Sequence, residues 1–165
     1  MAGTFSFDLV SDFDRQELVN AIDQTLREIR TRYDLKDSKS DIKLEEARLV
    51  ITSESEYHLT QIKDLLETKV LRRNLSLKIL EWGKVEEAGG NTYRQVVTIR
   101  KGIAEDQARK LNKQIREHFP KTQPQIQGDA LRITAKSKDE LQAVIRFIRE
   151  HEAEYPVALQ FTNYR

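Results

Sequence analysis

Hydrophobic and polar positions along the chain follow a pattern that recurs once, 82 positions further on. The matched positions include Leu49 with Leu131, Ile51 with Ile133, Leu59 with Leu141 and Ile62 with Val144. In each copy the apolar residues first alternate, as in a strand, and then recur every third or fourth position, as in a helix. Because this offset is close to half of the 165 residues, the pattern predicts two copies of one supersecondary unit.

The same order of elements is predicted in both halves. In the first half we expect a strand at 4–11, a helix at about 14–33, strands at 41–45 and 48–52, a helix at 55–73 and a strand at 76–82. In the second half we expect a strand at 93–100, a helix at 103–119, strands at 125–127 and 131–135, a helix at about 137–150 and a strand at 159–164. This β-α-β-β-α-β order predicts an α+β fold of two ferredoxin-like sandwiches, each with an antiparallel sheet and two helices on one face.

Domain boundaries are predicted from a change in composition. The segment from Gly83 to Asn91 contains three glycines and has no apolar period, which is typical of a flexible connection. We therefore expect a first ferredoxin-like domain at 1–84, a linker at 85–92 and a second domain at 93–165. The first strand lies near one terminus and the last near the other, so the sequence leaves open an exchange of terminal strands between the domains.

Composition places the chain among proteins of the cytoplasm. It is 38% hydrophobic and 33% charged, and no apolar run approaches the roughly 20 residues that a membrane-spanning helix needs. The first residues have neither a basic leader nor an apolar signal core, so a cytoplasmic location without membrane contact is expected. Zero cysteines exclude disulfides and thiolate metal sites.

Charge is distributed unevenly along the sequence. Residues 1–90 contain 14 Lys+Arg and 18 Asp+Glu, whereas residues 91–165 contain 14 and 9. This asymmetry directs an anionic ligand to the second half. Attraction between two oppositely charged domains is an equally good explanation.

No motif in the sequence indicates catalysis. His58, His118 and His151 are far apart in sequence and have no metal-ligand spacing. The chain contains no Gly-x-Ser-x-Gly, His-Glu-x-x-His or Gly-x-x-x-x-Gly-Lys-Ser/Thr motif. We therefore expect a protein that is not an enzyme, with no metal and no cofactor.

Two basic segments fall where helices are predicted to begin. Arg100 and Lys101 precede Gly102 between a strand and a helix, where backbone amides would point at an anion. Arg132 lies on a strand, and Lys136 and Lys138 surround the start of the following helix. A strand-borne Arg can form two parallel hydrogen bonds to a phosphate or a guanine edge. An ordinary helix cap with surface lysines explains the second segment as well.

Aromatic residues on the strands are a weaker sign of nucleic-acid binding. RNA-recognition domains of this strand order stack bases on aromatic side chains of the open sheet face. Phe5, Phe7 and Phe161 occupy alternating positions, which favours the core for all three. The Lys/Arg-Gly-Phe/Tyr-Gly/Ala-Phe-Val-x-Phe/Tyr signature of that family is missing.

Several segments together resemble the YajQ family of bacterial nucleotide-binding proteins. The segments are Phe7–Asp12, Ser53–Ser55, Lys101–Ile103, Gln125–Val144 and Phe161–Arg165. The resemblance covers nearly the whole chain and implies two ferredoxin-like domains and a non-catalytic protein that binds nucleotides. Members of the family have been linked to GTP, transfer RNA and, with a partner transcription regulator, cyclic di-GMP. Ala135 departs from the glycine expected before Lys136.

The leading hypothesis is therefore a cytosolic, non-enzymatic protein of the YajQ type that binds a purine nucleotide: GTP, ATP or cyclic di-GMP. Its expected ligand-binding residues are Arg100, Lys101, Arg132, Lys136, Lys138, Asn163 and Arg165. One alternative is a protein that binds RNA or tRNA along the phosphate backbone. Another is an adaptor for a protein partner such as a transcription regulator.

Overall fold

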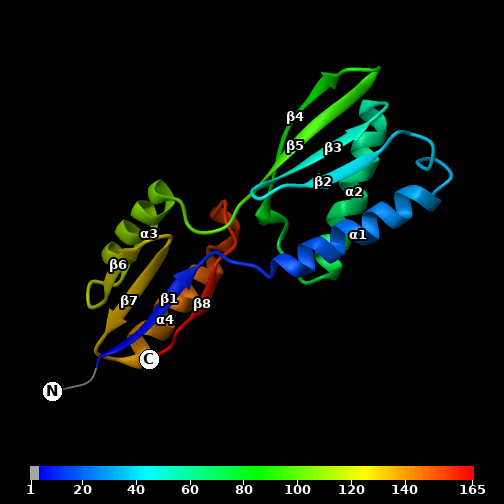
Figure 1. Cartoon of the computed structure of the whole chain (residues 1–165). Coiled ribbons are helices and arrows are strands. Elements are labelled where there is room, and N and C mark those ends of the chain that lie inside the picture. Colours follow the sequence, from blue (N-terminus) through cyan, green and yellow to red (C-terminus); the bar gives the residue numbers. More distant parts are fainter. Residues whose placement is uncertain (1–3) are drawn as a thin grey trace. The chain divides into compact units, whose positions relative to one another are not determined.

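The computed structural model describes residues 4–165 and divides the chain into two compact units (Figure 1). One unit, the inserted unit, is the continuous segment 13–100. The other, the split unit, combines the first twelve residues with residues 101–165. Each unit has its own sheet, its own pair of helices and its own core, and each is described separately.

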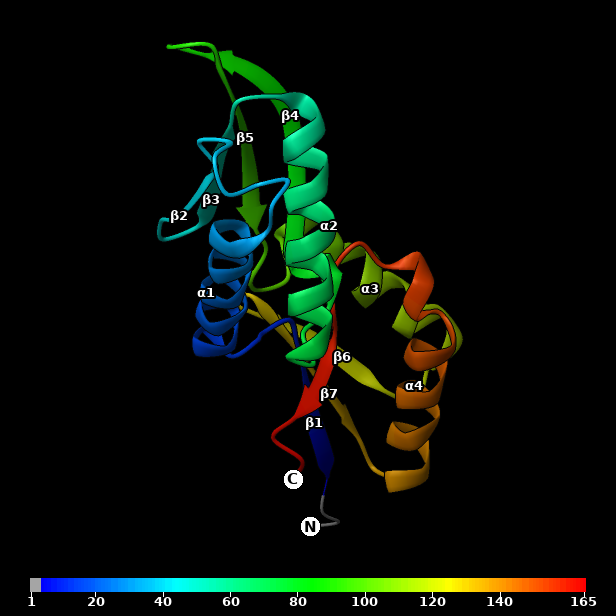
Figure 2. The same cartoon turned by 90° about the vertical axis from the view of Figure 1, so that its right-hand side faces the viewer.

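The split unit has the complete ferredoxin-like topology. Its elements are β1 (Phe5–Val10), α3 (Glu105–His118), β6 (Gln123–Gln127), β7 (Ala130–Ala135), α4 (Lys138–Glu150), the short 3₁₀ helix η2 (Glu152–Glu154) and β8 (Gln160–Thr162). The strands form an antiparallel sheet in the order β6-β7-β1-β8. Both helices lie on one face of this sheet (Figure 2), which leaves the other face without a helix of the same unit.

The inserted unit contains the same arrangement, except that the strand equivalent to β1 comes last in its sequence instead of first. Its elements are α1 (Arg15–Thr31), β2 (Asp41–Leu44), β3 (Arg48–Ser53), α2 (Glu56–Arg72), η1 (Leu77–Ile79), β4 (Leu80–Ala88) and β5 (Thr92–Ile99). The sheet order is β2-β3-β5-β4. β5 therefore occupies the place that β1 has in the split unit. The prediction of two duplicated α+β units with antiparallel sheets is confirmed.

Alternation along the strands separates a core face from an open face in the split unit. Phe7, Leu9, Leu131 and Ile133 are fully buried against α3 and α4. Phe161 packs edge-on against Phe7, with ring centroids 5.7 Å apart, and Phe5 packs against the same core. The strand aromatics are core residues, as their spacing indicates, and are therefore not a stacking surface for bases.

The structure divides the chain at other positions than the sequence analysis expects. β1 pairs with β7 and β8, so the first strand belongs with residues 101–165, and the exchange left open by the sequence is present for that strand. The expected linker at 85–92 is the tip of the β4–β5 hairpin, in which Glu86 is opposite Arg94 and Ala88 is opposite Thr92. This hairpin is largely exposed and carries no apolar period, so the sequence pattern does not reveal it.

Charge is balanced within each folded unit. The inserted unit contains 16 Lys+Arg and 16 Asp+Glu, and the split unit contains 12 and 11. The excess of basic residues after position 90 disappears because Asp8 and Asp12 join the split unit, whereas Arg94 and Arg100 belong to the inserted unit. Net charge therefore does not direct an anion to either unit. Any preference for an anion depends on the local arrangement of side chains.

Candidate functional site

Polar side chains cover the open face of the split unit's sheet. Successive strand residues point to opposite faces, so Ser6 and Asp8 of β1 lie opposite the face that buries Phe7. On β7, Arg132 and Thr134 lie on this same open face. Asp8 is opposite Arg132 and Ser6 is opposite Thr134 in the register of the two strands.

A buried carboxylate, Asp8, joins three segments of the chain on this face. Its side chain accepts hydrogen bonds from Arg132 Nε at 2.9 Å and Arg132 Nη2 at 3.3 Å. Asn163 Nδ2 donates a third bond at 2.8 Å. The Arg132 hydrogen bonds, with Asn163 and the charge of Arg165, lower the pKa of Asp8 below its ordinary value, although burial opposes the shift. Asp8 is only 8% exposed, so it holds Arg132 in place more than it contacts solvent.

A bulge at the end of the chain brings Asn163 and Arg165 to this cluster. Thr162 is opposite Asp8, and Arg165 exchanges two backbone hydrogen bonds with Ser6, at 3.0 and 2.9 Å. Asn163 and Tyr164 therefore lie opposite the single residue Phe7, and this one extra residue makes a β-bulge. Asn163 has φ of 53°, a left-handed conformation that Asn tolerates better than most residues.

The end of β7 opens into a hollow, the α4 N-terminal hollow, of about 570 Å³. Lys121, Thr134 and Lys136 contribute polar groups to its wall. Ser137 also lines it and caps α4 by accepting a hydrogen bond from the Asp139 amide at 3.1 Å. Lys136 is thus placed where the positive end of the helix dipole favours an anion.

The other predicted cations lie elsewhere. Lys138 Nζ is 5.2 Å from the centre of the Phe5 ring. Arg100 belongs to the inserted unit and pairs with Glu81 at 3.4 Å, whereas Lys101 pairs with Asp12 at 3.4 Å. Of the seven predicted residues, the structure brings Arg132, Asn163 and Arg165 together around Asp8. It places Lys136 just beyond the end of β7, at the α4 N-terminal hollow.

The backbone amides after Lys101 do not face an anion. The Gly102 amide donates to the Ser11 carbonyl at 2.6 Å, and the Ile103 amide donates to the Asp129 carbonyl at 2.9 Å. Gly102 has φ of 85°, and a Cβ there would lie 2.5 Å from an Asp129 carboxylate oxygen. The glycine is needed for this close turn, and the amides of Gly102 and Ile103 are not available to an anion.

Comparison with known proteins assigns the chain to a family. The model of the family described as "Nucleotide-binding protein YajQ-like" matches residues 5–165. A nucleotide-binding protein of Roseiflexus sp. (strain RS-1) is 59% identical over the full length of both chains. Those of Roseiflexus castenholzii and Synechococcus sp. (strain JA-3-3Ab) are 61% and 58% identical, again over both full lengths. The chain belongs to the YajQ-like family.

One grouping in this YajQ-like chain resembles a catalytic triad and is not one. Ser55 Oγ lies 2.8 Å from His58 Nδ1, and Glu54 Oε1 lies 3.8 Å from the same nitrogen. A triad needs the two partners on different ring nitrogens. Ser55 Oγ instead caps α2 by accepting from the His58 amide at 3.1 Å.

The other two histidines of the YajQ-like chain, His118 and His151, share one aromatic neighbour. His118 and His151 both stack on the Phe147 ring, at 4.7 and 4.2 Å between centroids. Each has its Nδ1 within hydrogen-bonding distance of a helix carbonyl. Within residues 4–165, no group of three His, Asp or Glu side chains could hold a metal ion, and no helix is long and apolar enough to cross a membrane.

Sequence reasoning missed Asp8, Lys121 and Thr134. Asp8 is a charged residue between two apolar positions of a strand, and such a residue is buried only when it is paired; that signal was available. Lys121 joins the hollow only because β6 pairs with β7, so its role depends on the fold.

Proposed function

We propose that this YajQ-like chain binds a purine nucleotide of the GTP or cyclic di-GMP class on the open sheet face of the split unit, in the cytoplasm and without chemical turnover. The observation that carries the proposal is the row of Arg132 and Thr134 on β7 and Lys136 directly after this strand, which leads into the α4 N-terminal hollow. The names of the relatives support the nucleotide, and the row supports its placement.

Phosphates fit the hollow best. Lys121 and Lys136 supply ammonium groups, which outnumber the single carboxylate of Glu140 in the lining. Thr134 supplies a hydroxyl, and the N-terminus of α4 adds the positive end of its dipole. Charge-assisted hydrogen bonds of this kind are stronger than neutral ones.

The base then lies toward Arg132. Two N–H groups of Arg132 bind Asp8, which leaves three of the five guanidinium N–H groups for a ligand. Because a planar guanidinium donates in parallel to the O6 and N7 of guanine, this arrangement favours guanine over adenine. Asp8 is the positioning residue, and Asn163 and Arg165 complete the edge of the site.

Isothermal titration calorimetry with GTP, ATP and cyclic di-GMP at two salt concentrations tests the proposal. Changing Arg132 and Lys136 together to Ala should weaken binding of the preferred nucleotide at least about tenfold. The matched control changes Lys110 and Arg146 to Ala, which removes the same charge from exposed helix positions of the same unit. Unchanged affinity in the folded site variant would contradict the placement. Release of GDP or of a linear product would contradict the absence of turnover.

RNA binding is the second candidate, because three hollows adjoin around the β6 edge. A hollow of about 460 Å³ shares Arg116 with one of about 510 Å³. The latter shares Gln123 and Thr134 with the α4 N-terminal hollow. Such a track suits a flexible polyanion that is held by its backbone. Steep weakening with salt and tighter binding of longer RNA would favour this candidate.

A further inference from the structure

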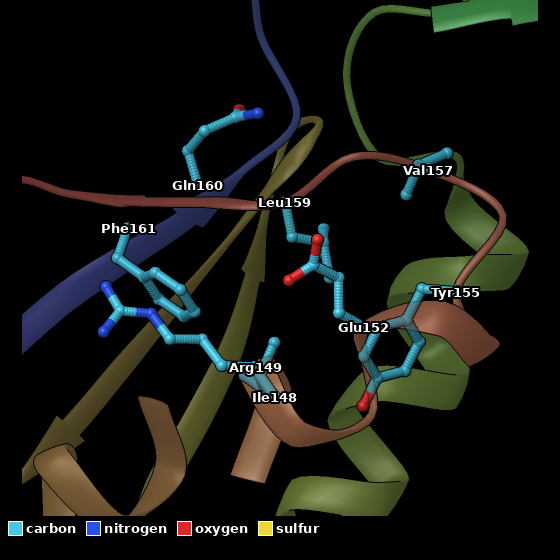
Figure 3. Close-up of a pocket in the computed structure, with 8 residues that line it drawn as sticks. All are labelled: Ile148, Arg149, Glu152, Tyr155, Val157, Leu159, Gln160 and Phe161. Atoms are coloured by element: carbon cyan, nitrogen blue, oxygen red, sulfur yellow. The ribbon is translucent and has the colours of Figure 1, made fainter. Parts of the chain in front are cut away.

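A second hollow, the α4 C-terminal hollow, lies at the opposite end of α4 (Figure 3). It has a volume of about 370 Å³, is open to solvent on one side, and is lined by the last turn of α4, η2, β8 and the segment between η2 and β8. None of the seven residues predicted from the sequence lines it. Its size is within the lower range of small-molecule sites, roughly 300 to 1,000 Å³.

The wall of this hollow is mainly apolar. Ile148 and Val157 are 2% and 8% exposed, and Leu159 and Phe161 are partly buried beside them. Tyr155 closes one side, and its hydroxyl donates to Gln114 Oε1 at 3.2 Å. Burial, with the nearby charge of Glu154, raises the pKa of Tyr155, so this side chain remains a neutral wall. An aliphatic side chain of a ligand would be buried favourably here.

Two opposite charges stand at the same hollow. Arg149 lies over the Phe161 ring, with its guanidinium carbon 5.1 Å from the ring centre, and no carboxylate within residues 4–165 pairs with it. The Glu152 carboxylate extends between Arg149 and Leu159 (Figure 3). A carboxylate can accept about four hydrogen bonds, so Glu152 can bind a further donor in addition to its existing contact.

The surroundings disfavour a nucleotide in this hollow. Glu150, Glu152 and Glu154 are all exposed around the end of α4, and a helix C-terminus carries the negative end of the dipole. Phosphates would be repelled, whereas an ammonium group would be attracted. A ligand that itself carries one negative and one positive charge fits this environment better than a nucleotide does.

We propose that the α4 C-terminal hollow binds a free apolar α-amino acid. The carboxylate of the amino acid binds Arg149, its ammonium group binds Glu152, and its side chain packs on Ile148 and Leu159. A free amino acid carries both charges next to an apolar group. An interior peptide residue carries neither charge, and a peptide terminus carries one of them.

Titration of the full chain with L-leucine, leucinamide and N-acetyl-leucine, followed by calorimetry or NMR, tests each charge separately. Leucine should bind at least about tenfold more tightly than either analogue, because each analogue lacks one charge-assisted contact. Glycine should bind more weakly than leucine, because it has no side chain to bury.

Two substitutions should give a crossed pattern. Arg149→Gln should lower the affinity for leucine about tenfold and leave the affinity for leucinamide unchanged, since leucinamide has no carboxylate. Glu152→Gln should lower the affinity for leucine by a similar factor and leave the affinity for N-acetyl-leucine unchanged, since N-acetyl-leucine has no ammonium group. A merely structural role of either residue would weaken all three ligands alike. Arg149→Gln should also leave GTP affinity unchanged, which separates this inference from the proposed nucleotide site.

Matched controls are available on the same helix. Arg146→Gln and Asp139→Asn change exposed residues of α4 that do not line the hollow, and both variants should bind leucine as the parent chain does. Leu159→Trp should fill the hollow and abolish binding. The proposal is overturned if leucine, valine and phenylalanine all fail to bind, if leucinamide binds as tightly as leucine, or if a nucleotide displaces the amino acid.

Discussion

At the scale of the residue, Asp8 is the side chain on which the open face of the split unit depends. From the middle of β1, its carboxylate accepts hydrogen bonds from Arg132 on β7 and from Asn163 near the end of the chain. Leaving a buried carboxylate unpaired is costly. Arg132 therefore has two roles, one in the fold and one proposed in the ligand site, and unfolding must be measured alongside binding for each variant.

Asp8→Asn should lower the free energy of unfolding at neutral pH by about 1–3 kcal/mol, because charge-assisted hydrogen bonds to Arg132 are lost. The pKa of Asp8 is lower in the folded chain than in the unfolded one. Its contribution to stability is thus present above the unfolded pKa of about 3.9 and is lost as the pH falls through the lower folded value.

Urea unfolding between pH 7 and pH 3 measures this effect. The parent chain should lose more stability than Asp8→Asn on acidification. Asp23→Asn, at an exposed position of α1, is the control and should have nearly the parental pH dependence. If Asp8→Asn and the parent chain lose the same free energy of unfolding between pH 7 and pH 3, Asp8 does not contribute to the pH dependence of stability.

At the scale of the element, local pattern predicts β7 and α4 well and the start of α3 poorly. The alternating residues before Ser137 and its cap are local signals, and the observed bounds, Ala130–Ala135 and Lys138–Glu150, agree closely with the expected ones. The turn before α3 is instead set by Ser11 and Asp129, which are distant in sequence. Such partners leave no local signal, so the sequence pattern does not reveal that the Gly102 and Ile103 amides are already hydrogen-bonded.

The start of α3 offers a stabilising substitution. Ala104 is at the N-cap with extended backbone and makes no side-chain cap. Ala104→Ser should raise the free energy of unfolding by about 0.5–1 kcal/mol by accepting a hydrogen bond from the first turn. Chemical denaturation measures the change, and Ala153→Ser, an exposed substitution outside α3, should have little effect. A lower stability of Ala104→Ser would mean that the turn cannot accommodate the cap.

At the scale of the whole molecule, one ferredoxin-like unit is inserted into the other. The insertion joins the split unit where Gly102 donates to Ser11, so the chain leaves and returns at neighbouring positions. The internal repeat predicts the two units, but it does not determine which sheet each terminal strand joins. That choice depends on pairing across more than one hundred residues, as between Asp8 and Arg132.

Fragments distinguish the observed division from the expected one. Residues 13–100 contain a complete sheet and core, and this fragment should unfold cooperatively by itself. Residues 1–84 lack β5, which lies between β3 and β4, and should remain largely unfolded. Circular dichroism during thermal unfolding measures both. A folded 1–84 fragment, or an unfolded 13–100 fragment, would contradict the observed division.

The position of β1 also has a consequence for synthesis. Among the strands within residues 4–165, this strand is synthesised first, but both of its neighbours, β7 and β8, come more than one hundred residues later. At translation rates of about 5–20 residues per second, β1 waits roughly 6–25 seconds for β7. During this time the inserted unit can already fold. The apolar residues of β1 remain exposed, so the first strand made is among the last to fold and is a natural substrate for chaperones that bind nascent chains.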